Sequence, residues 1–314
     1  MRLGPVPSTS WAIVMTCGIV STDLSAVHQP VLSAILLWFA AGVWVFLAGA
    51  LGVPLFLQQG RFGREVASPG VLTIVAATAV LGSRLAVSGY RTVPAVLLVL
   101  TAVLCAVLLG PVLRRWVTPT MGIAFLIGVS ADSVALLSAT LAVPYGASWL
   151  CWAAMGCLLG GLGLYCFAAA RFDLRQLLSG HGDHWIAGGA LAISALAAGR
   201  ITEAAGQLGL VRQHHHALTV GTLVVWCAAM LWLPVLIAAE VVRPRIRYDI
   251  RRWATGFPIG MYAACSFTVG QVTGIGGIVE FARLWTWVSV AATLALLAGL
   301  VRRLALTDVW VPAH

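Results

Sequence analysis

Long apolar runs without charged residues are the feature that most restricts how this chain can fold. A transmembrane helix needs about 20 mostly apolar residues, and roughly ten such segments follow one another along the 314 residues. Hydrophobic residues make up 61% of the chain and charged residues only 9%, whereas soluble domains carry about 25% charged residues. We therefore predict an all-α integral membrane protein, with one transmembrane domain over residues 1–314.

Short turns divide the apolar runs into spans. The predicted spans cover residues 8–24, 31–56, 69–88, 93–113, 118–142, 147–170, 184–204, 216–239, 253–273 and 284–300. Very short connections join each odd span to the next even one, so the unit is a helical hairpin repeated five times. The first span is rich in Ser and Thr and lacks a clear cleavage motif, so we expect it to stay as the first helix.

Odd and even spans differ in composition. Odd spans carry Gly, Ser, Thr and isolated charges, whereas even spans are mostly Leu, Val, Ala and Trp. This alternation predicts an inner ring of odd helices around a polar path and an outer ring of even helices that faces lipid. Small residues also let helices pack closely without any path, and that alternative stays open. The glycine candidates for the inner ring or pore lining are Gly18, Gly128, Gly188 and Gly260.

Arginines set the expected orientation, and every one of the 19 basic residues is an arginine. Fourteen lie on one side of the predicted spans (Arg2, Arg61, Arg64, Arg114, Arg115, Arg171, Arg175, Arg243, Arg245, Arg247, Arg251, Arg252, Arg302, Arg303) and five on the other (Arg84, Arg91, Arg200, Arg212, Arg283). Cytoplasmic loops carry the excess of positive charge. We expect a multi-pass cell-membrane protein with both termini in the cytoplasm and no nucleic-acid partner.

Charged residues inside spans are costly and usually face the bundle interior. Those of this chain all lie on odd spans: Asp23, Arg84, Asp132, Arg200 and Glu203. We expect Asp132 to form a salt bridge with Arg84 or Arg200 and to hold inner helices together. If Asp132 is unpaired and open to a water-filled path, a proton relay becomes the better interpretation.

Histidines cluster in two loops but predict no metal site. His181, Asp183 and His184 precede the seventh span, and His214–His216 precede the eighth, so the two groups face opposite sides of the membrane. The chain lacks the H-E-x-x-H, G-x-S-x-G and P-loop motifs. We expect no cofactor and no enzyme activity, with an intramembrane enzyme or sensor as the alternative from another functional class.

Three stretches resemble a known transporter family. Residues 7–21 read PSTSWAIVMTCGIVS, residues 252–263 read RWATGFPIGMYA, and residues 182–190 read GDHWIAGGA. The first two resemble the first and ninth helices of the tellurite-resistance/dicarboxylate transporter family, and the third resembles strings in its actinobacterial members. That family includes bacterial tellurite-resistance proteins, fungal malate permeases and sulfite pumps, and plant slow-anion channels.

The resemblance implies ten helices in five hairpins, a pore of odd helices within each protomer, and a homotrimer. It also implies transport of small inorganic anions or C4-dicarboxylates, gated by an aromatic residue on the ninth helix. Phe257 is the matching position, Phe267 is the competing aromatic, and Pro258 should kink the helix. A proton-coupled carrier or exporter of the tellurite or sulfite type is the alternative within the family.

Overall fold

The computed structural model describes residues 8–57, 68–116, 120–179, 182–210, 212–244 and 248–308. Helices dominate these residues, and no β-strand occurs among them apart from one isolated bridge between Thr120 and Phe172. The fold is therefore that of an all-α integral membrane protein, as the apolar runs predict.

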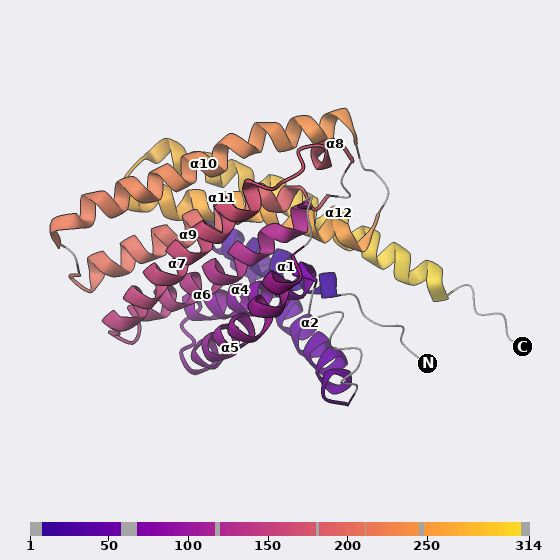
Figure 1. Ribbon diagram of the computed structural model, residues 1–314, viewed down its shortest axis with the longest axis horizontal. Coiled ribbons are helices and arrows are strands. Elements are labelled where there is room, and N and C mark those ends of the chain that lie inside the picture. The colour runs from indigo at the N-terminus through magenta and orange to yellow at the C-terminus, as the bar shows by residue number, and fades with distance from the viewer. Residues whose placement is uncertain are drawn as a thin grey trace, which may run out of the picture.

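Five helices, labelled in Figure 1, form an inner ring by their mutual contacts. They are α1 (Trp11–Ala26), α4 (Thr73–Val87), α6 (Leu126–Ala142), α9 (Trp185–Gln207) and α11 (Trp253–Thr273). The short 3-10 helices η2 (Pro69–Leu72) and η3 (Gly122–Phe125) lead into α4 and α6. Each inner helix packs against the next one in this order, and α11 packs back against α1, which closes the ring.

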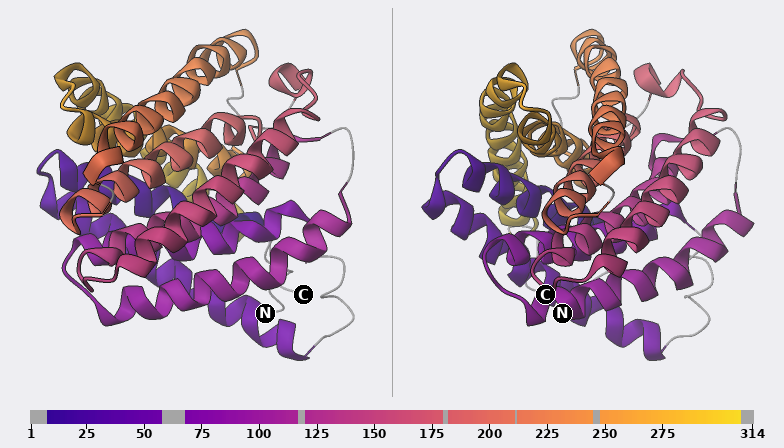
Figure 2. Two further views of the ribbon diagram at one scale, coloured as in Figure 1. Left: turned by 60° about the vertical axis from the view of Figure 1, so that its left-hand side comes forward. Right: turned by 90° about the vertical axis from the view of Figure 1, so that its left-hand side faces the viewer.

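Five further helices surround the ring: α2 (Pro30–Leu57), α5 (Thr92–Arg114), α7 (Ser148–Ala169), α10 (His215–Val242) and α12 (Gly276–Asp308). Each packs against the inner helix that precedes it in the chain. In the end-on view of Figure 2, α10 (orange) and α12 (yellow) stand at the outer edge of the bundle. A single short turn, α8 (Gln176–Ser179), lies between α7 and α9.

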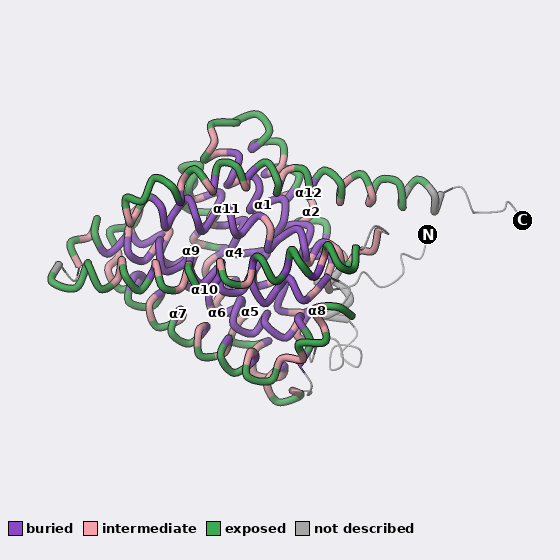
Figure 3. Tube along the Cα trace, turned by 90° about the horizontal axis from the view of Figure 1, so that it is seen from above, coloured by how far each residue is buried: buried purple, intermediate pink, exposed green. Residues whose placement is uncertain are grey.

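Burial separates the two rings. In their most apolar stretches, 94% of the residues of α9 are buried, against 17% for α12. The buried part of the chain trace is central and the exposed part peripheral in Figure 3. The predicted arrangement of odd helices inside and even helices outside is confirmed, because lipid can solvate Leu and Val on the outer ring but not the polar groups of the inner one.

Eight of the described helical segments are long and apolar enough to cross a membrane by length and composition. The helix α1 is apolar but shorter, and α11 is not among the eight. Gly, Thr and Ser residues lower the hydropathy of α11, whose polar groups are covered by neighbouring helices instead of lipid. A single-helix hydropathy test therefore underrates helices that lie inside a ring.

The five hairpin turns share one backbone feature. Each contains a residue with positive φ: His28, Gly89, Gly146, Gly209 and Gly274. The left-handed conformation suits glycine because it has no Cβ, and four of the five turns use it. A residue with positive φ therefore lies in each turn that reverses the chain after an inner helix.

All five inner helices run in the same direction. We call the end at which they begin the start end, and the opposite end, with the five hairpin turns, the turn end. Predicted and observed bounds agree closely except in two spans. The fifth span begins at Gly122 and not at 118, because Thr120 N donates to Arg171 O (3.1 Å) in the bridge with the end of α7. The tenth begins at Gly276, eight residues before the predicted start. The apolar pattern does not include its first turns, because they are largely exposed and carry the Glu280–Arg283 ion pair.

Candidate functional site

A hollow opens at the start end of the inner ring, and we call it the wide mouth. Its volume is about 260 Å³. Every inner helix contributes at least one lining residue, namely Ala12, Thr73, Leu126, Ile186 and Ala254. Polar side chains of Gln176, Ser179, Asp183 and Arg251 border it as well. Because all five helices line it, the wide mouth lies on the axis of the ring.

A second and much smaller hollow, the narrow mouth, lies toward the turn end. Its volume is about 20 Å³, enough for about one water molecule. Four inner helices line it: α1 with Ile19 and Thr22, α4 with Val80, Ser83 and Val87, α6 with Leu136 and Thr140, and α9 with Leu196 and Arg200. The two mouths therefore share four inner helices, α1, α4, α6 and α9, and lie toward opposite ends of the ring.

Phe257 is buried on α11 and is not among the residues that line either mouth. It follows Ala254 of the wide mouth by three residues, which is about one helical turn, so both residues share one face of α11. Met261 continues this face one turn further. The side chains of Phe257 and Met261 are 2% and 0% exposed, and Phe257 is part of the hydrophobic core. Two large side chains of α11 are thus buried about one and two turns beyond Ala254 of the wide mouth.

Phe267 follows Phe257 by ten residues, which turns it about 80° around α11 from the direction of Phe257. It follows Gly260 by seven residues, about two turns, so these two positions share a face. A Cβ added to Gly260 would lie 2.6 Å from Ile19 Cγ2 and 3.3 Å from Val20 Cγ2 of α1. Phe267 is therefore directed at the neighbouring helix α1, as Gly260 is, and Phe257 lies between that direction and the direction of Ala254 in the wall of the wide mouth.

The glycines named from the sequence lie at contacts between helices. A Cβ on Gly18 would lie 2.9 Å from Val80 Cγ1 of α4, and one on Gly128 would lie 3.0 Å from the carbonyl oxygen of Gly161 on α7. Gly188 faces the Tyr262 hydroxyl and Leu236. These residues are part of the inner ring as expected, and their small size allows the helices to approach.

Arg84 lies at the turn end, in the last turn of α4, and is not among the residues that line the narrow mouth. Its side chain is buried and donates only to hydroxyl groups: Nε to Ser21 (3.0 Å), Nη2 to Ser33 (2.8 Å) and Nη1 to Ser88 (2.7 Å). Among the described residues no carboxylate forms a salt bridge with it. Within the described residues, the guanidinium of Arg84 is therefore held by hydroxyl groups alone.

The predicted salt bridge of Asp132 is wrong. The Asp132 carboxylate accepts a hydrogen bond from Ser194 Oγ (2.6 Å), and its other oxygen has no partner among the described residues. Arg200 pairs with Glu203 (2.8 Å). Arg200 follows Ser194 by six residues, about 9 Å along the helix, and Arg84 is directed at α1 and α2. Both arginines therefore bond to nearer groups.

Asp132 also lies off the path between the mouths. Its side chain is 1% exposed and lies against Gly161 of α7, where an added Cβ would meet the carboxylate. The pair with Ser194 thus joins α6, α7 and α9. A proton relay through Asp132 would require its carboxylate to be open to a water-filled path. In the structure this carboxylate lines neither of the two hollows.

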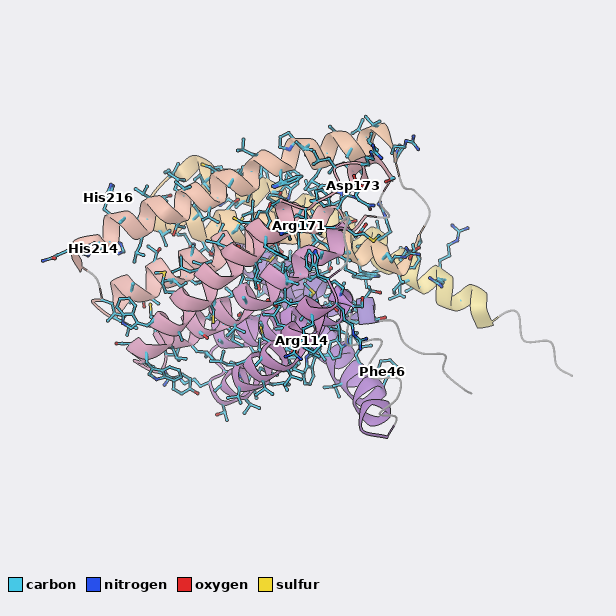
Figure 4. All side chains as sticks on the ribbon, viewed as in Figure 1. Phe46, Arg114, Arg171, Asp173, His214 and His216 are labelled. Carbon is cyan, nitrogen blue, oxygen red and sulfur yellow. The ribbon has the colours of Figure 1, made fainter. Side chains whose placement is uncertain are left out.

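The two histidine groups lie at opposite ends of the bundle. His184 is buried at the start of α9, while His214 and His216 are at the turn end, far from Arg171 and Asp173 in Figure 4. His181 lies outside the described residues. Within the part of the chain that the structure describes, no group of three His, Cys, Asp or Glu side chains has the proximity to hold a metal ion.

Comparison with known proteins identifies the family. A family model described as voltage-dependent anion channel matches residues 6–301, nearly the whole chain. The chain belongs to this family. It is the same family as the tellurite-resistance/dicarboxylate transporters that the sequence resembles, so the match covers every helix of both rings and confirms the resemblance.

Two curated relatives are uncharacterized membrane proteins from two strains of Mycobacterium tuberculosis. Each is 30% identical to this voltage-dependent anion channel family member over 131 residues. The aligned part covers 40% of this chain and 65% of the relative's own length. These relatives agree with a membrane location and add no activity.

Sequence reasoning missed several residues of this family member's wide mouth. Thr73, Gln176 and Arg251 border it, although none stands out as an isolated charge inside an apolar run. They lie just before or at the starts of helices or in a connecting loop. The signal that could have found them is the parallel direction of the odd spans, which brings all five helix starts to one end.

Proposed function

We propose that this protein transports small anions across the membrane along the axis of its inner ring, within a single protomer. Membership of the voltage-dependent anion channel family supports anions as the transported class. The observation that carries the proposal is the wide mouth, which is lined by all five inner helices.

Helix direction supports anion preference at the wide mouth. The start of an α-helix carries a partial positive charge equivalent to roughly half an elementary charge, and five parallel helices begin at this end. Arg251 and Asp183 both border the same hollow, and Arg251 pairs with Asp249 (3.7 Å), so the helix starts supply the net positive potential there. An anion at the start end therefore meets a favourable potential without any cationic ring in the membrane.

At the turn end the five inner helices finish, and the end of a helix carries a partial negative charge. This charge repels an anion, so a positive group is needed to offset it. Arg84 lies there in the last turn of α4 and has no carboxylate partner among the described residues. Its charge offsets the unfavourable end of the path. We assign Arg84 the role of keeping the turn end passable for anions.

Phe257 is the proposed gate. An aromatic side chain across a narrow apolar path blocks ions by steric and dewetting cost. Pro258 removes one helix hydrogen bond directly beside it, so α11 is easier to bend at this position than elsewhere. A change of the Phe257 side-chain rotamer or a movement of α11 would open the path.

Flux measurements on purified protein in liposomes test the proposal. Chloride, nitrate, sulfite and malate are compared one at a time, with potassium and sodium as cation controls. We expect anion flux above that of empty liposomes and no cation flux. The orientation we propose, with both termini in the cytoplasm, puts the wide mouth on the cytoplasmic side. A homotrimer is proposed from the family resemblance.

A proton-coupled carrier is the second candidate. Its supporting observation is Asp132, a buried carboxylate with one hydrogen bond, to Ser194, among the described residues, and this mechanism requires a movement of the inner helices that opens Asp132 to one of the hollows. A carrier would move its anion faster when a proton gradient is imposed, whereas a channel would follow the anion gradient and the voltage. The same liposomes with an imposed pH difference separate the two mechanisms.

A further inference from the structure

A third cavity lies outside the inner ring, behind the helix that carries Phe257. Its volume is about 250 Å³. It lies at the start end between α10, α11 and α12, with Thr255, Gly256 and Ile259 on its α11 side. These residues flank Phe257 in the sequence but belong to the outer face of α11.

Polar groups gather at one part of this cavity. Arg252 Nη2 donates to Glu240 Oε1 (2.9 Å), while Arg252 Nη1 is buried without a hydrogen-bond partner among the described residues. The indole N–H of Trp185 is likewise buried and unpartnered there, on a side chain that is 4% exposed. An unsatisfied buried donor costs about 1–3 kcal/mol. Two such donors on residues that line one cavity indicate a missing acceptor.

Tyr248 adds a third donor. Its hydroxyl oxygen accepts from Trp253 Nε1 (3.1 Å), which leaves the hydroxyl proton available. Burial raises the pKa of Tyr248 above its ordinary value, so the phenol keeps this proton at neutral pH. The Tyr248 ring packs directly on Gly299 of α12, which holds the hydroxyl group near the cavity.

The remaining wall is apolar and opens to the membrane. Ala292, Ala295 and Leu296 of α12 line it together with Ile259, and Ala295 is exposed on the outer surface of the bundle. The cavity therefore combines hydrogen-bond donors at the membrane boundary with an apolar slot that leads to the lipid-facing side. This combination matches the phosphate and the acyl chain of one molecule.

We propose that this cavity binds an anionic phospholipid, with its phosphate at Arg252 and Trp185 and an acyl chain along α12. Arginine and indole N–H groups are suitable donors to phosphate oxygens, and basic pockets between helices on the cytoplasmic side bind anionic headgroups. Glu240 competes with the phosphate for Arg252. A lipid in this position contacts α11 on the side opposite Phe257.

The test measures lipid binding to the detergent-purified full chain by native mass spectrometry, so it does not depend on transport. The probes are phosphatidylglycerol, phosphatidylcholine and inorganic phosphate. We expect phosphatidylglycerol to bind more tightly than phosphatidylcholine and inorganic phosphate to compete weakly. Competition by phosphate as strong as that of the lipid would make the cavity a phosphate site and overturn the lipid assignment.

Substitutions around the cavity should change the affinity for phosphatidylglycerol in opposite directions. Arg252→Gln and Trp185→Phe should each weaken phosphatidylglycerol binding by about tenfold, the scale of one charge-assisted hydrogen bond. Glu240→Gln should tighten it, because the competing carboxylate is gone. Thermal unfolding of each variant checks that it folds, and a purely structural role would not produce tighter binding in Glu240→Gln.

Arg302→Gln is the matched control, because it removes the same charge from an exposed position on α12 at the same end. Binding by this variant should equal that of the wild type. Wild-type affinity in both Arg252→Gln and Trp185→Phe would overturn the proposal. Equal losses in Arg302→Gln and Arg252→Gln would assign the effect to general surface charge and overturn it too.

Discussion

The ring of Pro258 packs directly on Gly189, across the contact between α11 and α9. A Cβ added to Gly189 would lie 2.8 Å from the Pro258 Cβ and 3.1 Å from its Cα. A proline ring cannot rotate away, and its Cα is backbone. The position of Pro258, and with it the neighbouring Phe257, therefore depends on the absence of a side chain at residue 189.

Gly189→Ala should consequently destabilise the protein by roughly 1–3 kcal/mol, the usual cost of an extra methyl group in a packed core. We expect a lower thermal unfolding midpoint in detergent. Gly156→Ala on α7 is the control, because its Cβ would meet no atom within 4 Å, and alanine favours a helix over glycine. An unfolding midpoint of Gly189→Ala at or above that of the wild type would disprove this close contact.

Arg84→Gln should reduce anion flux, because it removes the uncompensated positive charge at the turn end. It should also cost roughly 1.5–3 kcal/mol of stability through lost charge-assisted hydrogen bonds. Arg84→Lys separates the two effects, since it keeps the charge and loses the three-pronged bonding to Ser21, Ser33 and Ser88.

We expect liposome flux in the order wild type, Arg84→Lys, Arg84→Gln at equal amounts of folded protein. Arg283→Gln removes an exposed arginine at the same end, one that is already paired with Glu280, and should leave flux unchanged. If Arg84→Gln and Arg84→Lys lose flux equally, the loss follows from the hydrogen bonds and not from the charge.

Asp132→Asn should leave anion flux and its pH dependence close to those of the wild type. The asparagine oxygen can still accept the hydrogen bond from Ser194, and the side chain lies off the path between the mouths. The measurement is flux into liposomes at a series of pH values. A pH response that is present in the wild type and abolished in Asp132→Asn would support the proton-coupled carrier instead.

Much of the fold could be predicted from the sequence. The ninth predicted span matches α11 at both ends, from Trp253 to Thr273, and the polarity difference between odd and even spans predicts the two rings. Both signals arise from lipid, which penalises every polar group that is not covered by protein. The start of α12 was missed because its first turns carry Glu280 and Arg283, so an apolar pattern does not include them.

The partners of the charged side chains could not be predicted. Composition places Asp132, Arg84 and Arg200 inside spans, but the side of each helix that they occupy depends on how the ring is assembled. Arg84 bonds to serines of α1, α2 and α4, and Asp132 to a serine of α9. Serine occurs in every inner helix, so the sequence does not indicate which serine bonds to which charged side chain.

Phe257→Ala tests the central claim most directly. Removing the aromatic ring should open the path beyond the wide mouth and raise basal anion conductance by about tenfold or more, since each 1.4 kcal/mol taken from a barrier is a factor of ten. The lost packing should cost roughly 3–5 kcal/mol of stability. Phe267→Ala is the matched control and should lose stability without gaining conductance, because its face of α11 is directed at α1.

The decisive measurement is therefore the single-channel or liposome anion conductance of wild type, Phe257→Ala and Phe267→Ala at equal amounts of folded protein. The gate assignment predicts a large increase for Phe257→Ala alone. Folded Phe257→Ala that conducts no better than the wild type would contradict it, and an increase in Phe267→Ala alone would move the gate to that residue.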